Sequence, residues 1–165
     1  LSGQDIVRKC MEDPAIYSFM ERCVYDEIIP VLTSRCISRP DGKSMEKKIQ
    51  RLSRIALEAA KQCGRGIVPK VGALRSWEAA LSEMGEAPLA IVFYEEATAP
   101  LREMLQGAPE QVSILIGAEG GFSREEVEEA KAKGLLAASL GKRILRCETA
   151  PLAALSVLMY ETGNL

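Results

Sequence analysis

Apolar residues follow two patterns along this chain, short continuous runs and helical spacing, and the second half shows both. Continuous apolar runs, typical of parallel strands buried on both faces, occupy Leu89–Tyr94, Val112–Gly117 and Leu135–Leu140. Segments with helical spacing of apolar residues follow them, at Ala99–Gln106, Ser123–Lys133 and Thr149–Glu161. This alternation predicts an α/β fold, in which a parallel sheet is covered by helices on both faces.

The first half of the chain has weaker strand signals and one long amphipathic helix. Glu27–Leu32 predicts a short strand despite its proline, and a loop follows over Thr33–Gly42. Ser44–Gln62 predicts a helix with Ser44 as its N-cap and Gly64 just past its end. Weaker patterns predict a helix over 16–24, an extended piece at Ile67–Val71 and a helix over Arg75–Met84. We expect residues 16–165 to form the domain and residues 1–15 to be an N-terminal remnant or linker.

Composition narrows the classes of protein to which this chain can belong. The chain has 165 residues, of which 47% are hydrophobic, as expected for one globular domain. No apolar run approaches the length needed to cross a bilayer, so no membrane partner is expected. The sequence has no histidine, which excludes histidine-ligated zinc and an imidazole base. Its five cysteines include no C-x-x-C pair, which predicts reduced thiols in the cytoplasm and no metal site.

Charge is distributed unevenly. Residues 35–75 hold 11 of the 21 Lys and Arg and 3 of the 23 Asp and Glu, a local balance of +8 against −10 elsewhere. Such a block predicts a surface that contacts the phosphates of a polyanion such as RNA. The alternative is a solvated helix face without a partner. The cations we expect to bind RNA are Arg35, Arg39, Lys43, Lys47, Arg51 and Arg65.

Two loops carry the candidate chemistry. The first, here called the glycine loop, is residues 116–123 (IGAEGGFS), between a predicted strand and a capped helix. Open α/β sheets bind ligands at this place. Its glycines do not follow a dinucleotide or P-loop spacing, and Glu119 lies among them, so hydroxyls or a cation suit it better than phosphates. The alternative is a tight structural turn.

The second loop, here called the arginine loop, is residues 140–151 (LGKRILRCETAP), between the last predicted strand and the last helix. Its arginines and Glu148 surround the apolar pair Ile144–Leu145. Apolar residues beside arginines suit an adenine pocket next to an anion or substrate site. The alternative is a packed connection with surface arginines. Thr149 is the expected N-cap of the last helix.

Taken together, the two loops resemble the RsmE-like family, 16S ribosomal RNA uracil-N3 methyltransferases of the SPOUT superfamily. The segments EAAKQCGRGIVPKV (Glu58–Val71) and IIPVLTSR (Ile28–Arg35) resemble that family too. The resemblance implies a C-terminal trefoil knot, S-adenosyl-L-methionine as cofactor and a homodimer that completes the site. It also implies a chain without the family's usual N-terminal PUA-like barrel. Ala118 stands where the family commonly has proline, and Cys147 where it commonly has threonine.

Site residues follow from the resemblance, position by position. The cofactor-binding residues it implies are Phe93, Tyr94, Gly117, Glu119, Gly120, Gly121, Leu140, Ile144, Leu145, Thr149 and Ala150. The reaction it implies is methyl transfer to N3 of a uridine in small-subunit ribosomal RNA. Since no histidine is available, we expect Arg146, and next Arg143, to stabilise the uridine anion. Glu148 is expected to act as the base or to orient those arginines.

Three other functions are weighed against this one. The chain could be a SPOUT methyltransferase that acts on another RNA. It could instead be a non-catalytic RNA-binding or assembly module. A dinucleotide-dependent oxidoreductase is disfavoured by the glycine spacing and by the carboxylate of Glu119.

Overall fold

The computed structural model describes residues 26–37, 41–63, 67–106, 109 and 111–163. The predicted helix over 16–24 and the residues Arg39, Gly64 and Arg65 lie outside these ranges. The chain divides into two compact units, one of residues 1–32 and 37–75, the other of residues 33–36 and 76–165. Residues 33–36 therefore belong with the second unit, although both neighbouring segments belong with the first.

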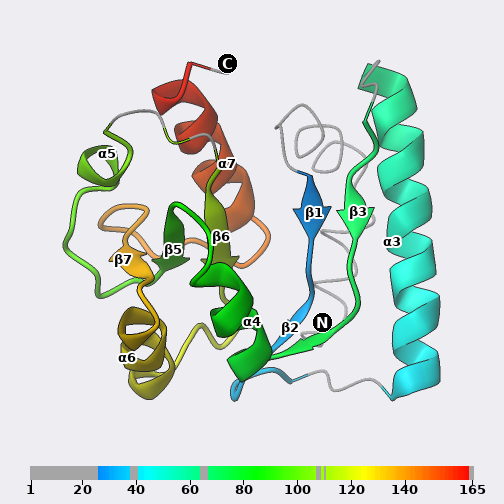
Figure 1. Ribbon diagram of the computed structural model, residues 1–165, viewed down its shortest axis with the longest axis horizontal. Helices are drawn as coiled ribbons and strands as arrows, with labels where there is room; N and C mark the ends of the chain where they lie inside the picture. The colour runs from blue at the N-terminus through cyan, green and yellow to red at the C-terminus, as the bar shows by residue number, and fades with distance from the viewer. Residues whose placement is uncertain (1–25, 38–40, 64–66, 107–108, 110, 164–165) are drawn as a thin grey trace. The chain divides into compact units, whose positions relative to one another are not determined.

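The second unit is built on a three-stranded parallel sheet (Figure 1). Its strands are β5 (Ala90–Phe93), β6 (Ser113–Ile116) and β7 (Leu136–Ala138), with β5 in the centre. Phe93 is in register with Ile116 on one side and with Ala138 on the other. The parallel sheet and the α/β class are thus confirmed, with strand ends one or two residues inside the predicted bounds. The loops after all three strands leave the same edge of the sheet.

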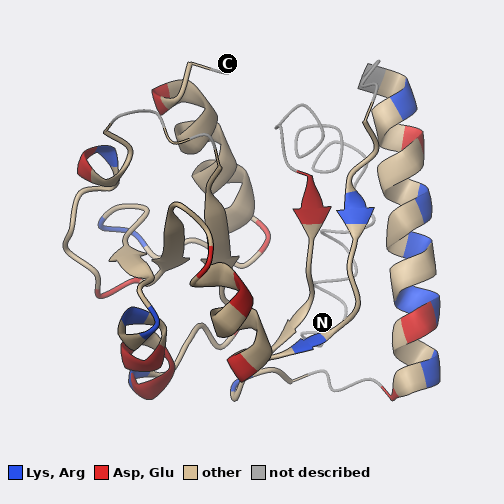
Figure 2. Cartoon of the chain, viewed as in Figure 1, with Lys and Arg blue, Asp and Glu red and all other residues tan. Residues whose placement is uncertain are grey.

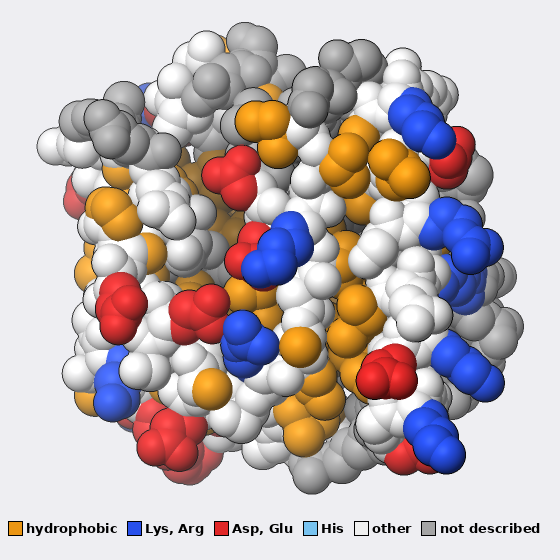
Figure 3. All heavy atoms as spheres, turned by 45° about the vertical axis from the view of Figure 1, so that its right-hand side comes forward, with side chains coloured by type: hydrophobic (Ala, Val, Ile, Leu, Met, Phe, Trp, Pro, Cys, Tyr) orange, Lys and Arg blue, Asp and Glu red, His pale blue; other side chains and the backbone are white. Residues whose placement is uncertain are grey.

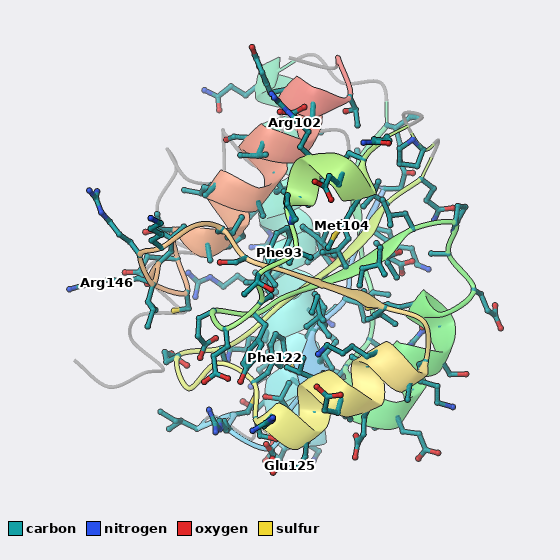
Figure 4. The ribbon with its side chains drawn as sticks, turned by 90° about the vertical axis from the view of Figure 1, so that its left-hand side faces the viewer. Phe93, Arg102, Met104, Phe122, Glu125 and Arg146 are labelled. Atoms are coloured by element: carbon teal, nitrogen blue, oxygen red, sulfur yellow. The ribbon has the colours of Figure 1, made fainter. Side chains whose placement is uncertain are left out.

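Both faces of this sheet are covered. Ile91 and Phe93 join a buried cluster with α5 (Leu101–Met104) and α7 (Ala150–Glu161). On the other side, α6 (Arg124–Ala132) and α4 (Trp77–Met84) lie below the strands in Figure 4. Since every residue of β5 is buried, the central strand is a continuous apolar run, as parallel sheets require.

Local sequence explains where these helices begin. Helix α5 is one turn rather than Ala99–Gln106, because the residue before Pro100 is disfavoured in helical conformation. Helix α4 begins at Trp77 rather than Arg75, since the side chain of Ser76 caps it by accepting from Ala79 N. The capping box of Ser123 and Glu126 is confirmed. Thr149 occupies the N-cap position of α7 but makes no side-chain capping bond, so that expectation is wrong in part.

The first unit contains short strands and one long helix. Strand β1 (Glu27–Ile28) pairs in parallel with β3 (Lys70–Val71), and β2 (Val31–Leu32) pairs with β4 (Arg75–Ser76), which spans the boundary of the unit at residue 75. Pro30 separates β1 from β2, because proline has no N–H to donate to a ladder. The predicted single strand is therefore two.

Helix α3 (Gly42–Cys63) begins two residues before the predicted start. Asp41 caps it, because Asp41 Oδ1 accepts from Ser44 N at 2.8 Å; the prediction that Ser44 is the cap is wrong. Its buried face consists of Met45, Leu52, Ala56, Ala59 and Ala60. Within the described residues, no helix is long and apolar enough to cross a membrane.

Candidate active site

The glycine loop folds tightly back on itself after β6. A Cβ atom on Gly117 would lie 2.9 Å from Gly121 Cα, so only glycine fits there. Gly121 has a φ of +61°, and its N–H donates to Ala118 O at 2.9 Å. The next residue, Phe122, is fully buried and packs against Trp77, with ring centroids 5.6 Å apart. The loop is therefore a fixed turn held at the carboxyl edge of the sheet.

Glu119 carries an unusual carboxylate in this loop. Its Oε1 atom is buried and accepts no hydrogen bond from the residues that the structure describes. A buried acceptor without a donor is costly, so this oxygen fits a ligand that brings a donor. Hydroxyl groups and an ammonium are such donors, whereas a phosphate is not. Glu119 thus suits a ligand that carries a hydroxyl or an ammonium group.

The loop after β5 adds polar groups at the same edge. Tyr94 N donates to Ala138 O at 2.9 Å, which ties the ends of β5 and β7 together. Desolvation, and then a hydrogen bond with Glu96, raise the pKa of the Tyr94 hydroxyl above its ordinary 10.0. The carboxylate oxygens of Glu95 lie 3.7 Å from where a Cβ on Gly121 would stand. Phe93, by contrast, has its side chain in the core beneath the site, so its main chain alone is placed to line it (Figure 4).

The arginine loop leaves β7 at that edge and is largely exposed. Leu140 packs against the buried cluster of the sheet, and Leu145 is half-buried. Ile144, the other residue of the predicted adenine pocket, is 83% exposed. Within one chain, Ile144 and Leu145 therefore do not form a pocket together. Arg143 and Thr149 are exposed, and Ala150 is half-buried at the start of α7.

Arg146 and Glu148 form a loose ion pair in the arginine loop. Arg146 Nη1 lies 3.8 Å from Glu148 Oε1, and their side chains are 84% and 22% exposed. Cys147 Sγ donates to Glu148 Oε2 at 3.3 Å. Figure 4 shows Arg146 extending away from the body of the unit. The main chain of Arg146 is fixed, because its carbonyl accepts from the N–H groups of Thr149 and Ala150. The guanidinium is thus exposed on an anchored main chain, and it pairs only loosely with the neighbouring carboxylate.

The cations predicted to bind RNA are divided between the two units. Lys43, Lys47 and Arg51 are exposed at successive turns of α3, and Figures 2 and 3 show Lys and Arg along this helix. Arg35 lies elsewhere, in the second unit. Its Nη1 donates to Gly120 O at 3.1 Å, so this cation contacts the glycine loop itself.

Sequence patterns missed two contributors to the site. Glu126 Oε1 accepts from Ser34 N at 2.7 Å, which ties residues 33–36 to the start of α6. The capping box identified Glu126 but not this second partner, which lies 92 positions away. Glu95 beside Gly121 was also missed, because nothing in the local pattern separates it from a surface acid.

Comparison with known proteins identifies the family to which the chain belongs. The model of the RNA methyltransferase domain matches residues 18–159. Ribosomal RNA small subunit methyltransferase E of Bacillus subtilis is 37% identical over 141 residues, covering 81% of this chain and 55% of that protein. The protein of the same name from Mesomycoplasma hyopneumoniae is 32% identical over 123 residues, covering 74% and 53%. The chain therefore spans about half the length of these curated relatives.

Solved structures agree with the sequence matches. Ribosomal RNA small subunit methyltransferase E from Neisseria gonorrhoeae, solved with S-adenosyl methionine, superimposes with a TM-score of 0.77 at 30% identity. The match covers 90% of this chain and 61% of that one. The resemblance carried by the glycine and arginine loops is thereby confirmed. The chain belongs to the RNA methyltransferase family.

Proposed function

We propose that this chain transfers a methyl group from S-adenosyl-L-methionine to N3 of a uridine in small-subunit ribosomal RNA. The observation that carries the proposal is the buried Glu119 Oε1, which has no hydrogen-bond partner among the described residues and lies inside a tight glycine turn at the carboxyl edge of the sheet. The names of the relatives support the RNA class, and the Neisseria structure supports the cofactor. A trefoil knot in the C-terminal half is part of this proposal, by likeness to the family.

The cofactor would lie where the three loops meet. Gly117, Gly120 and Gly121 let the loop take its tight turn beside the cofactor, and Glu119 would accept from the cofactor's ribose or ammonium. Leu140, Leu145 and Ala150 would surround the adenine from the arginine loop, with main-chain groups beside Tyr94 at the other end. When bound, the cofactor supplies an electrophilic methyl group.

The protein's own residues would prepare the nucleophile. Uridine N3 carries a proton at neutral pH, so its attack requires a group that stabilises the developing anion. Arg146 is suited to this role, because its exposed guanidinium reaches outward from an anchored main chain. Arg143 would assist it. Glu148, half-buried beside Arg146, would accept the proton or hold the guanidinium in place.

A second copy of the chain would complete the site. Ile144, Val157 and Tyr160 are apolar side chains exposed on the arginine loop and α7. Helix α7 carries no charged residue before Glu161, which is unusual for a helix facing water. A homodimer that covers this surface would also bury Ile144 beside the adenine. The RNA would contact the cations of α3, and the protein would act in the cytoplasm with its substrate.

The Arg146→Ala variant tests the catalytic assignment. We expect methyl transfer to unmethylated small-subunit ribosomal RNA to fall about 100-fold or more, because a stabilising charge at the reacting base is lost. Cofactor affinity should stay unchanged, since Arg146 extends into solvent. Lys133→Ala, which removes an exposed charge at the far end of α6, is the matched control. Mass spectrometry of the nucleosides identifies the product. Turnover retained in Arg146→Ala would refute the role, and a methylated nucleoside other than N3-methyluridine would refute the substrate.

A further inference from the structure

Arg35 differs from the other cations of the basic block in what it contacts. Lys43, Lys47 and Arg51 are exposed along one helix, whereas Arg35 lies against the glycine loop. A Cβ on Gly120 would stand 3.0 Å from Arg35 Cβ and 3.2 Å from Arg35 O. The backbone of the loop is therefore packed directly on this residue. Its guanidinium adds the hydrogen bond from Nη1 to Gly120 O.

The segment that carries Arg35 is anchored in the same unit. Glu126, which is buried, accepts from Ser34 N with one carboxylate oxygen and from Ser123 N with the other. Ser123 is the residue that ends the glycine loop and caps α6. Thr33 is buried as well, and its N–H and hydroxyl contact Cys36 Sγ. One carboxylate thus fixes the position of Arg35 relative to the glycine loop.

The guanidinium is placed to do two things at once. A guanidinium has five N–H donors in a planar fork, and the carbonyl of Gly120 takes one of them. The side chain is exposed, so a phosphate can reach the rest. Arg35 and Arg124 also help lower the pKa of Glu125, although hydrogen bonds to its own N–H and to Ser123 contribute more. The cations Arg35 and Arg124 therefore lie near the carboxylate of Glu125, at the end of the loop where α6 begins.

We propose that Arg35 is a positioning residue that couples RNA binding to cofactor binding: it holds the glycine loop through Gly120 and binds a backbone phosphate of the RNA with its other donors. This inference rests on the proposed function and adds a regulation of that site. RNA bound to Arg35 holds the guanidinium against Gly120 O and so strengthens one contact of the turn that holds the cofactor. By linkage, bound cofactor strengthens RNA binding by the same factor.

Two affinities measured together test the coupling. The probe is sinefungin, an analogue that has no methyl group to transfer, titrated calorimetrically with and without small-subunit ribosomal RNA. In the unmodified chain, we expect RNA to raise the affinity for sinefungin about fivefold or more. In Arg35→Ala, that ratio should fall to one, and affinity for sinefungin alone should weaken by about threefold to tenfold.

Arg35→Lys separates coupling from charge. A lysine keeps the positive charge and most of the RNA affinity, but a single ammonium cannot hold the carbonyl and a phosphate in one plane. We expect RNA binding near the unmodified value with the coupling ratio reduced. Lys47→Ala is the matched control, which should weaken RNA binding and keep the ratio.

The outcomes distinguish this inference from the proposed function. A coupling ratio that is unchanged in Arg35→Ala would overturn the inference and leave the methyltransferase assignment intact. A chain that binds neither sinefungin nor S-adenosyl-L-methionine would overturn the proposed function and the coupling with it. Circular dichroism of each variant shows that it is folded, and Arg35→Lys provides the answer if Arg35→Ala is not.

Discussion

The carboxylate of Glu126 joins two segments that are far apart in sequence, and its replacement by glutamine measures that connection. Oε1 accepts from Ser34 N at 2.7 Å and Oε2 accepts from Ser123 N at 2.9 Å. Glutamine keeps the size and one oxygen, but its NH₂ group is a donor that would face one of these N–H groups. One of the two bonds must therefore be lost in a site that is only 6% exposed.

The expected loss of stability follows from the loss of one buried hydrogen bond. A hydrogen bond to a charged group contributes about 1.5–3 kcal/mol, and a buried donor left unsatisfied costs a similar amount. We expect Glu126→Gln to lower the free energy of unfolding by about 2 kcal/mol. For a domain of this size, the midpoint of thermal unfolding should fall by about 4–8 °C. Urea unfolding followed by circular dichroism measures the free energy, and a thermal scan measures the midpoint.

A neighbouring glutamate provides the control. Glu128 is exposed on the same helix, where it pairs with Lys131 at 2.8 Å. Glu128→Gln makes the same chemical change without removing a buried bond, so its unfolding midpoint should match that of the unmodified chain. If Glu126→Gln were as stable as Glu128→Gln, the carboxylate would not hold residues 33–36 on the glycine loop, and the account of that contact would be wrong.

Four other predictions concern the site. Gly117→Ala should weaken S-adenosyl-L-methionine binding at least tenfold in calorimetry, because its Cβ would stand 2.9 Å from Gly121 Cα; Gly42→Ala, with nothing within 4 Å, should not. The fluorescence of Trp77, the chain's one tryptophan, should change when cofactor binds, since its ring lies 5.6 Å from Phe122; an unchanged spectrum at saturation would contradict this. Because the folded-state pKa of Tyr94 is raised, its contribution to stability should be complete below pH 10.0 and be lost as pH rises through the folded value; a tyrosinate absorbance titration against Tyr94→Phe measures this. Replacing Lys43, Lys47 and Arg51 together with alanine should reduce the slope of log affinity for RNA against log salt by about 2, and an unchanged slope would remove α3 from the interface.

Sequence predicted the features that are decided locally. Each apolar run of the second unit became a strand, because short apolar runs are typical of strands buried on both faces of a parallel sheet. The capping box at Ser123 was also predicted correctly, since both of its partners lie within one turn. The glycine loop followed from these two elements, because it is the segment between them.

Other features depend on competition between similar residues or on contacts between residues far apart in the sequence. Asp41 rather than Ser44 caps α3, and both residue types are good caps, so the pattern could not choose between them. The bond from Ser34 to Glu126 spans 92 positions and has no local signature. Arg35 looked like one cation among many, and only the fold separates it from the α3 row by placing it on Gly120. Ile144 was expected beside the adenine but is 83% exposed in the single chain, and the proposed homodimer is what would cover it.

Calorimetric titration of the chain with S-adenosyl-L-methionine, with NAD as the comparison, tests the central claim most directly. The account predicts that S-adenosyl-L-methionine binds and NAD does not, because Glu119 Oε1, buried and without a hydrogen-bond partner among the described residues, suits a ligand that brings a donor and not a pyrophosphate. Glu119→Ala should then weaken the binding while the unfolding midpoint does not fall, because the buried oxygen without a donor is removed. Failure of the folded chain to bind S-adenosyl-L-methionine, or equal binding of NAD, would contradict the account.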